Sequence, residues 1–280
     1  MREHAAMEFD FCKMHGAGND FLMINDMDER CLISKASIAA LCSRHRGIGA
    51  DGLILLRPSA AARFSMNYFN SDGGEAQMCG NGARCAAKFA HECGIAERVM
   101  AFETRAGMVR AEILKEGVRI DIGDVRGLAL AMHIASCARP VHFGACGVPH
   151  AVIVDDDARS LPHDEFVRFA RKVRHDPAFG AAGANVDVAS VTGKHRCSYR
   201  TYERGVEDET LACGTGAVVV SAVLVHLASV EPPILCETRG GDVLEVDCTR
   251  TADGATDCRL KGPVAVSFRG TFRAEDYERP

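Results

Sequence analysis

The feature that most constrains this chain is an internal repeat in which residues recur 134 positions later. The matches are Glu75 with Glu209, Cys79-Gly80 with Cys213-Gly214, and Glu103-Thr104-Arg105 with Glu237-Thr238-Arg239. A shift that stays constant over about 60 residues indicates two related halves rather than chance agreement among common residues. We therefore predict two similar domains, each with one matched cysteine.

Each half shows the same order of local patterns. Short apolar runs predict strands at Phe21–Ile24, Leu53–Leu56, Ala151–Val154 and Val186–Val188. Longer segments predict helices at Ala83–Glu92, Ala217–Leu227, Ser37–His45 and about His163–Arg174. The domains are expected at residues 1–127 and 128–265, and a C-terminal strand at about 266–280 is an option for completing the first one.

Composition narrows the class of partner. The 280 residues include 33 Lys and Arg against 38 Asp and Glu, which gives a formal net charge of −5 and a sequence pI of about 6.1. Nucleic acid and anionic membranes require clustered basic residues, so neither is expected as a partner. A small-molecule ligand is the remaining expectation.

The cysteines and the N-terminus indicate a compartment. None of the 13 cysteines forms a CxxC pair, so we expect neither a zinc site nor a thioredoxin-like redox site. The first residues lack the apolar core of a signal peptide, and no apolar stretch approaches the roughly 20 residues of a membrane span. We expect a cytoplasmic protein with free thiols.

Both matched cysteines are placed at the start of a predicted helix, flanked by glycines. The free N–H groups and the dipole at a helix start favour a carboxylate or phosphate, and they lower the pKa of a thiol. Glycines at 80, 82, 214 and 216 would let a ligand approach the backbone closely. A buried structural cysteine is the alternative for either copy alone.

Two such cysteines suit the inversion of a carbon centre. If the halves are related by a pseudo-twofold axis, one thiolate can remove a proton from one face while the other thiol returns a proton to the opposite face. Helix dipoles aimed at the substrate carboxylate would stabilise the carbanion. The sequence has no evident metal-ligand cluster or pyridoxal phosphate lysine motif, so the chemistry is expected to need no cofactor.

Six motifs resemble those of the diaminopimelate epimerase family, and together they span nearly the whole chain. They are KMHGAGNDF (Lys13 to Phe21), GIGADG (Gly47 to Gly52), FNSDGGEAQMCGNGARC (Phe69 to Cys85), GVPH (Gly147 to His150), GANVD (Gly183 to Asp187) and YERGVEDETLACGTGA (Tyr202 to Ala217). The resemblance implies an α/β (α+β) fold of two pseudo-symmetric domains, each a mixed β-sheet curled around a central helix, with the active site in the interdomain cleft. It also implies epimerisation of LL-2,6-diaminopimelate to the meso form in lysine and peptidoglycan biosynthesis, without a cofactor or metal, by a protein that is a homodimer.

The resemblance also assigns site residues. The two acid/base cysteines fall on Cys79 and Cys213. The positions that bind the substrate's carboxyl and amino groups are Asn19, Asn70, Gly80, Asn81, Asn185, Glu203, Arg204, Gly214 and Thr215. Arg204 could clamp a distal carboxylate with two hydrogen bonds, and a role in forming a turn is the alternative for each asparagine.

His150 is a candidate for a place beside the thiols, with a structural histidine as the alternative. Two positions depart from the family pattern, because Val148 stands where many members have Asn and Gly52 where some have Gln. Both changes remove a polar contact that could serve distal recognition. The remaining cysteines, including Cys12, Cys85 and Cys146, are interpreted as packing residues.

Two other functions fit the sequence. One is another cofactor-independent racemase, of the histidine or proline type, although CGNG at Cys79 differs from the CGH expected of a proline racemase. The other is a noncatalytic protein that binds an amino acid, a role that needs neither thiol. The symmetry leaves open which cysteine is the base in each direction.

Overall fold

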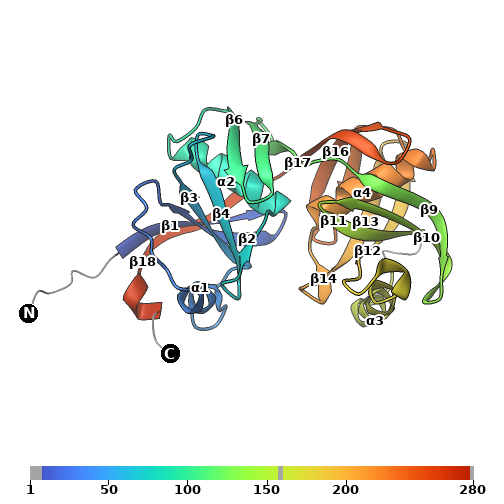
Figure 1. The fold of residues 1–280 in the computed structure, drawn as a ribbon, viewed down its shortest axis with the longest axis horizontal. Coiled ribbons are helices and arrows are strands. Elements are labelled where there is room, and N and C mark those ends of the chain that lie inside the picture. The colour runs from blue at the N-terminus through green and yellow to red at the C-terminus, as the bar shows by residue number, and fades with distance from the viewer. Residues whose placement is uncertain (1–7, 157–159, 278–280) are drawn as a thin grey trace, which may run out of the picture. The chain divides into compact units, whose positions relative to one another are not determined.

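The computed structural model describes residues 8–156 and 160–277, which divide into two compact units. Unit 1 is the described part of residues 1–120 and 264–280, and unit 2 is the described part of residues 121–263. Figure 1 shows that each unit consists of curved strands with helices. Within the described ranges, no helix is long and apolar enough to cross a membrane.

Unit 1 is built mainly of strands, with a short helix near its start and a longer one in its middle. Its elements are β1 (Glu8–Gly16), β2 (Asn19–Asn25), α1 (Lys35–Cys42), β3 (Gly52–Arg57), β4 (Ser65–Asn70), β5 (Glu75–Ala76), α2 (Gly80–Glu92), β6 (Val99–Thr104), β7 (Gly107–Ile113), β8 (Val118–Asp121), β18 (Ala265–Arg273) and η2 (Ala274–Tyr277).

The elements of unit 2, apart from its first strand and the short helix η1, follow the order of β1 to β8 in unit 1. They are β9 (Arg126–Ile134), β10 (Cys137–Cys146), β11 (Val148–Val154), α3 (His163–Arg174), η1 (Pro177–Phe179), β12 (Asn185–Gly193), β13 (Arg196–Glu203), β14 (Asp208–Thr210), α4 (Gly214–His226), β15 (Ile234–Glu237), β16 (Val243–Arg250) and β17 (Ala255–Gly262). All four predicted strands and all four predicted helices are therefore confirmed, with shifts of a few residues at their ends.

The two units also share one pattern of strand pairing. The pairs β1–β2 and β10–β11 are antiparallel, and the next pairs, β2–β3 and β11–β12, are parallel. The pairs β3–β4 and β12–β13 are again antiparallel, and β4–β6 and β13–β15 are parallel. The predicted repeat is thus a repeat of mixed sheets.

The ends of the two sheets are completed differently along the chain. In unit 2, β10 pairs with β9, which directly precedes it, whereas in unit 1 β1 pairs with β18 from the C-terminal end. The domain limits expected from the sequence, 1–127 and 128–265, stay a prediction.

A helix lies at the centre of each unit. Helix α2 packs against β1, β2, β3, β4 and β7, and α4 packs against β10 to β13 and β15 to β17. Helix α4 is apolar on all sides, and its residues from Gly216 to Leu224 are buried. Its run of valines has only modest helix propensity, so burial on every side rather than propensity stabilises it.

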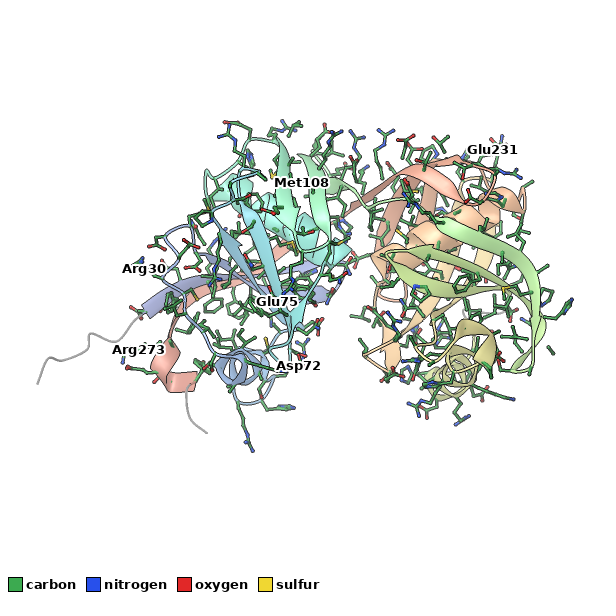
Figure 2. All side chains as sticks on the ribbon, viewed as in Figure 1. Arg30, Asp72, Glu75, Met108, Glu231 and Arg273 are labelled. Carbon is green, nitrogen blue, oxygen red and sulfur yellow. The ribbon has the colours of Figure 1, made fainter. Side chains whose placement is uncertain are left out.

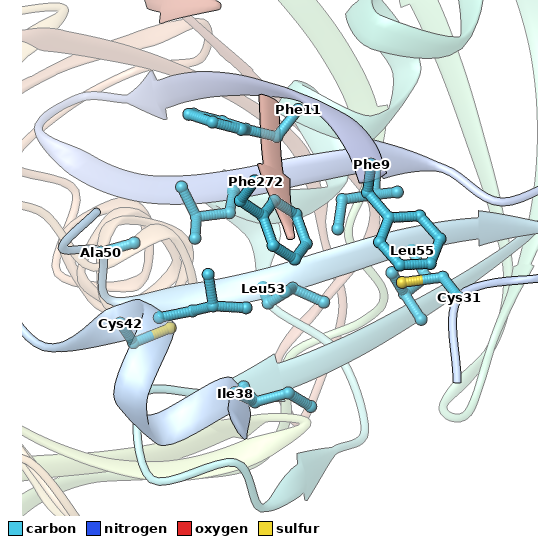
Figure 3. Packing of buried hydrophobic residues seen from close by; sticks show 12 residues of the cluster. Phe9, Phe11, Cys31, Ile38, Cys42, Ala50, Leu53, Leu55 and Phe272 are labelled. Carbon is cyan, nitrogen blue, oxygen red and sulfur yellow. The ribbon is translucent and has the colours of Figure 1, made fainter. Parts of the chain in front are cut away.

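The core of unit 1 lies between α1, β3 and the pair β1–β18. Figure 3 shows Phe9, Phe11 and Phe272 packed with Leu53 and Leu55. The ring centroids of Phe9 and Phe272 are 5.6 Å apart. This cluster fastens the C-terminal strand to the first strand of the chain.

Strand alternation separates the two faces of the sheet. On β7, Val109 and Ala111 are buried, whereas Met108, labelled in Figure 2, is 52% exposed.

The structure shows all 13 cysteines as free thiols. Cys12, Cys85 and Cys146 are at most 1% exposed, which confirms their interpretation as packing residues. The same interpretation is wrong for Cys93, whose side chain is exposed at the end of α2.

Candidate active site

Cys79 is the N-cap residue of α2, as the sequence predicts. Its backbone is extended, with φ −135° and ψ 124°, and helical residues begin at Gly80. Its thiol is partly exposed. Since the first N–H groups of a helix have no intrahelical acceptor, the turn that begins at Gly80 can donate hydrogen bonds to an anion.

The Asn19 side chain contacts two other predicted site residues of unit 1. Its Oδ1 accepts hydrogen bonds from Cys79 Sγ at 3.4 Å and from Asn81 Nδ2 at 3.2 Å. Its Nδ2 donates to Asp51 Oδ2 at 2.8 Å. Because an ionised carboxylate only accepts, Asp51 fixes which end of the Asn19 amide faces the thiol.

Asp51 belongs to a charged cluster that sequence reasoning missed. Arg44 donates to Asp51 Oδ1 at 2.7 Å and to Asp20 Oδ1 at 2.8 Å, and Lys13 pairs with Asp20 at 2.9 Å. Burial opposes ionisation of Asp20, but hydrogen bonds from Arg44 and Lys13 and their charges outweigh it and lower the Asp20 pKa to about 2. The signal was the carboxylates inside GAGND and GIGADG.

Arg84 supports the start of α2 from within the core. It is fully buried, and it donates to Asn81 Oδ1 at 2.8 Å and to the Gly80 carbonyl at 3.3 Å. A Cβ at Gly16 would lie 3.0 Å from the Asn81 carbonyl oxygen, so only glycine lets β1 approach this turn without displacing it. Sequence reasoning missed both residues.

Asn70 is the predicted residue of unit 1 that lies apart from this group. It ends β4, opposite Gly52 on β3, and it is exposed. Its backbone N–H donates to the Gly74 carbonyl at 2.8 Å and its carbonyl accepts from Gly73 at 2.9 Å. Within residues 8–156 and 160–277 its side chain makes no hydrogen bond to protein, so the amide is available to a ligand.

In unit 2, Cys213 is the N-cap residue of α4. Its Sγ accepts a hydrogen bond from the Gly216 N–H at 3.4 Å and lies 3.4 Å from Thr215 Oγ1. The hydroxyl of Tyr199 donates to the Cys213 carbonyl at 2.8 Å and so holds this turn from β13. Gly214 and Thr215 open the helix, as Gly80 and Asn81 do in unit 1.

The expectation that the helix start lowers the thiol pKa is wrong for Cys213 in the free chain. Burial raises the Cys213 pKa well above its ordinary value, and the negative charges of Glu203 and Asp187 raise it further. The hydrogen bond between Cys213 and the Thr215 hydroxyl and that from the Gly216 N–H lower it, but by less. Cys213 is therefore a protonated thiol at neutral pH.

Two of the flanking glycines are also constrained by packing. A Cβ at Gly216 would lie 2.6 Å from Asp187 Oδ1, and a Cβ at Gly82 would lie 2.9 Å from Ile54 Cδ1. Both distances are too short for a side chain to be accommodated without movement of its neighbours. The reason expected from the sequence is thus incomplete at these positions.

His150 lies on β11 with no exposed surface and contacts the start of α4. Its Nδ1 is 2.7 Å from Asp187 Oδ2, and its Nε2 is 3.0 Å from Thr215 Oγ1. Thr215 in turn contacts Cys213. The structure therefore brings His150 and Cys213 together through one hydroxyl, and it adds Asp187, which sequence reasoning missed.

The remaining predicted residues surround the same group. Asn185 Nδ2 is 3.3 Å from His150 Nε2, and Asn185 Oδ1 accepts from the Arg204 N–H at 2.8 Å. Glu203 is the last residue of β13, and its negative charge raises the pKa of Cys213. In the part of the chain that the structure describes, the Arg204 guanidinium has no acidic partner, so its donors can serve a carboxylate.

Each unit thus offers an acid/base group and hydrogen-bond donors. Each unit provides a thiol at a helix N-cap, with a side-chain oxygen at 3.4 Å. Among the described residues, no group of three or more His, Cys, Asp or Glu side chains could hold a metal ion. The arrangement suits proton transfer next to a bound carboxylate.

Comparison with known sequences gives one consistent family. The family model described as diaminopimelate epimerase matches residues 11–128 and 144–256. Diaminopimelate epimerase of Archaeoglobus fulgidus is 38% identical over 96% of this chain and 98% of its own, and that of Chlorobaculum tepidum is 37% identical over 92% and 99%. The Aquifex aeolicus enzyme is 33% identical over 96% and 99%.

Solved structures share the fold at low identity. A hydroxyproline epimerase from Agrobacterium vitis with bound trans-4-hydroxy-L-proline has a TM-score of 0.69 at 16% identity, covering 95% of this chain and 91% of its own. A probable proline racemase from Agrobacterium radiobacter has a TM-score of 0.67 at 16% identity, covering 94% and 92%. At such identity the likeness extends to the fold alone.

Proposed function

Because the chain belongs to the diaminopimelate epimerase family, we propose that it converts LL-2,6-diaminopimelate to meso-diaminopimelate with two cysteines and no cofactor. It is an amino-acid epimerase, hence an isomerase. The proposed reaction is a step of lysine and peptidoglycan biosynthesis.

The observation that carries the proposal is the repeated thiol. Cys79 and Cys213 occupy equivalent positions, each as the N-cap of the central helix of its unit. In the proposed reaction one thiolate takes the α-proton from one face of the carbon, and the other thiol gives its proton to the opposite face. The roles exchange in the reverse direction. The proposal therefore requires both thiols to transfer protons to and from the same substrate carbon.

The groups around each thiol have proposed tasks. The N–H groups of Gly80, Asn81, Gly214 and Thr215 would bind the carboxylate next to the reacting carbon and stabilise the charge that develops there. Asn19, Asn70, Asn185 and Glu203 carry oxygens that can accept from the ammonium group. The guanidinium of Arg204 can bind the distal carboxylate with two parallel hydrogen bonds.

The test is incubation of the reduced protein with LL-diaminopimelate in D₂O. We expect the meso form to appear with deuterium at the inverted α-carbon. Cys79→Ser and Cys213→Ser should each lower the rate at least about 100-fold, because each removes one acid/base group. Cys93→Ser, which removes an exposed thiol of unit 1, is the matched control and should keep the rate.

The other outcomes separate the alternatives. Conversion of another amino acid, such as histidine or proline, in place of diaminopimelate would keep the chemistry and replace the substrate. Binding of an amino acid without deuterium exchange, unchanged in both Ser variants, would contradict the proposal and favour a binding protein.

A further inference from the structure

The hydrogen bonds around Asn185 determine which of its ends faces His150. The backbone N–H of Arg204 can only donate, so the atom of Asn185 that it contacts at 2.8 Å is the amide oxygen. The amide nitrogen of Asn185 then lies 3.3 Å from His150 Nε2. Because that nitrogen only donates, Nε2 must carry a lone pair rather than a proton.

The opposite side of the imidazole agrees with this assignment. His150 Nδ1 lies 2.7 Å from Asp187 Oδ2, and both side chains are completely buried. A carboxylate accepts, so Nδ1 is the nitrogen that carries the proton. The Thr215 hydroxyl, 3.0 Å from Nε2, then donates to His150 and presents its own lone pairs to Cys213 Sγ at 3.4 Å.

The Asp187 carboxylate is itself held in place. Its Oδ1 accepts from the Thr201 hydroxyl at 2.6 Å, across the β12–β13 pair. The start of α4 packs on the same oxygen, since a Cβ at Gly216 would lie 2.6 Å from it. One oxygen is thus engaged by Thr201 and the other is directed at the imidazole.

We propose that Asp187 is the positioning residue that keeps the proton of His150 on Nδ1, so that Nε2 can receive the proton of Cys213 through the Thr215 hydroxyl. The inference rests on the proposed function, in which Cys213 must lose its proton in one direction of the reaction. It adds Asp187 and Thr201 to the residues that the reaction needs.

The step is a double proton transfer without a change in oxidation state. The S–H bond of Cys213 breaks as its proton passes to Thr215 Oγ1, and the O–H bond of Thr215 breaks as that proton passes to His150 Nε2. A thiolate and an imidazolium result, and the hydroxyl is regenerated. The Asp187 carboxylate, in contact with Nδ1, compensates the imidazolium charge inside the protein.

The first measurement is the protonation state of His150 in the unaltered protein. Nitrogen-15 NMR of labelled histidine distinguishes protonated from unprotonated ring nitrogens, and the His150 signals are identified by their loss in His150→Gln. We expect a protonated Nδ1 and an unprotonated Nε2 at neutral pH. A proton on Nε2, or on both nitrogens, would overturn the proposal whether or not the protein is an epimerase.

The second measurement uses Asp187→Asn. The Thr201 hydroxyl should donate its hydrogen bond to the new amide oxygen of residue 187. The NH₂ group of that amide then faces His150 Nδ1, so the imidazole proton should move to Nε2. We expect kcat for epimerisation to fall about 10- to 100-fold with KM within about threefold, as for the loss of a hydrogen bond to a charged group. Unchanged kcat and an unchanged tautomer would contradict the proposal.

Two further variants separate positioning from stability. Asp176→Asn removes another buried carboxylate of unit 2, which accepts from the Ser136 and Ala178 N–H groups, and should leave the tautomer and kcat unchanged. Adding Thr201→Val to Asp187→Asn frees the amide oxygen to face His150. It should restore the Nδ1–H tautomer and at least about threefold of kcat, which a purely structural role would not predict.

Discussion

Two opposing effects act on the pKa of the Cys213 thiol, and their magnitudes decide whether that pKa is raised or lowered. The partial charge at a helix start stabilises an anion by about 0.3–1 kcal/mol, up to about 2 kcal/mol. Full burial can raise a pKa by roughly 3–5 units, and each unit is about 1.4 kcal/mol. Burial therefore prevails at Cys213, which is 5% exposed, and the neighbouring Glu203 and Asp187 add to it.

This balance predicts the pH dependence of alkylation at Cys213 in the free protein. A raised pKa means that the thiolate, the reactive form, appears only at higher pH than in an ordinary thiol. The rate of iodoacetamide labelling, followed by mass spectrometry of the peptide that contains Cys213, should still rise above about pH 8.5, where free cysteine is half ionised. A rate that is already constant below pH 8 would contradict the raised pKa.

The residues that the sequence did and did not predict differ in a physical way. Cys79 and Cys213 were predictable because a thiol followed by Gly-x-Gly occurs twice at one spacing. Asp187 and Thr201 were not, because a single polar residue within an apolar strand pattern does not show what faces it across the sheet. Asp20 lies on β2 and Asp51 just before β3, 31 residues further on, and only folding reveals that they share Arg44.

The start of helix α4 meets β12 and β13 so closely that one residue must lack a side chain. Gly216 faces Asp187 Oδ1 and Thr201 Oγ1, at 2.6 Å and 3.1 Å from the position of a Cβ. The glycine therefore allows the Cys213 turn to lie against the buried carboxylate. A methyl group there would have to separate α4 from the two strands.

Substitution of this glycine tests the packing. Gly216→Ala should lower the free energy of unfolding by about 1–3 kcal/mol, the usual cost of inserting an atom into a packed core. Gly193→Ala, at the exposed end of β12, is the control, because its Cβ would meet its nearest neighbour only at 3.8 Å. Urea unfolding measures both. Equal stability of the two variants would show that α4 is not fixed against Asp187.

The repeat accounts for most of the molecule but not for its end. Because both halves carry the same patterns, the sequence was sufficient to predict two strands and two helices in each half, in the same order. The pairing of β18 with β1 could not be derived in this way, since strand patterns indicate which face is buried but not which strand lies alongside. The C-terminal residues therefore complete a unit whose other strands all lie between Glu8 and Asp121.

This connection makes unit 1 depend on the last strand of the chain. Phe272 of β18 is 5% exposed and contacts Phe9 and Phe11 of β1, with ring centroids 5.6 Å and 6.2 Å apart. Phe272→Ala should cost about 3–5 kcal/mol of stability, the usual range for a buried phenylalanine. Hydrogen exchange under native conditions should then show faster exchange in β1, β2 and β18.

A second phenylalanine on β18 serves as the control for the effect of Phe272 on the stability of unit 1. Phe268 is 45% exposed, and its ring makes one edge contact with Phe11, so Phe268→Ala should cost clearly less than Phe272→Ala. Amides of β12 and β13 in unit 2 serve as the internal reference. If protection in unit 2 falls as far as in unit 1, both units unfold as one cooperative body. If it is kept, the C-terminal strand stabilises only the unit with which it pairs.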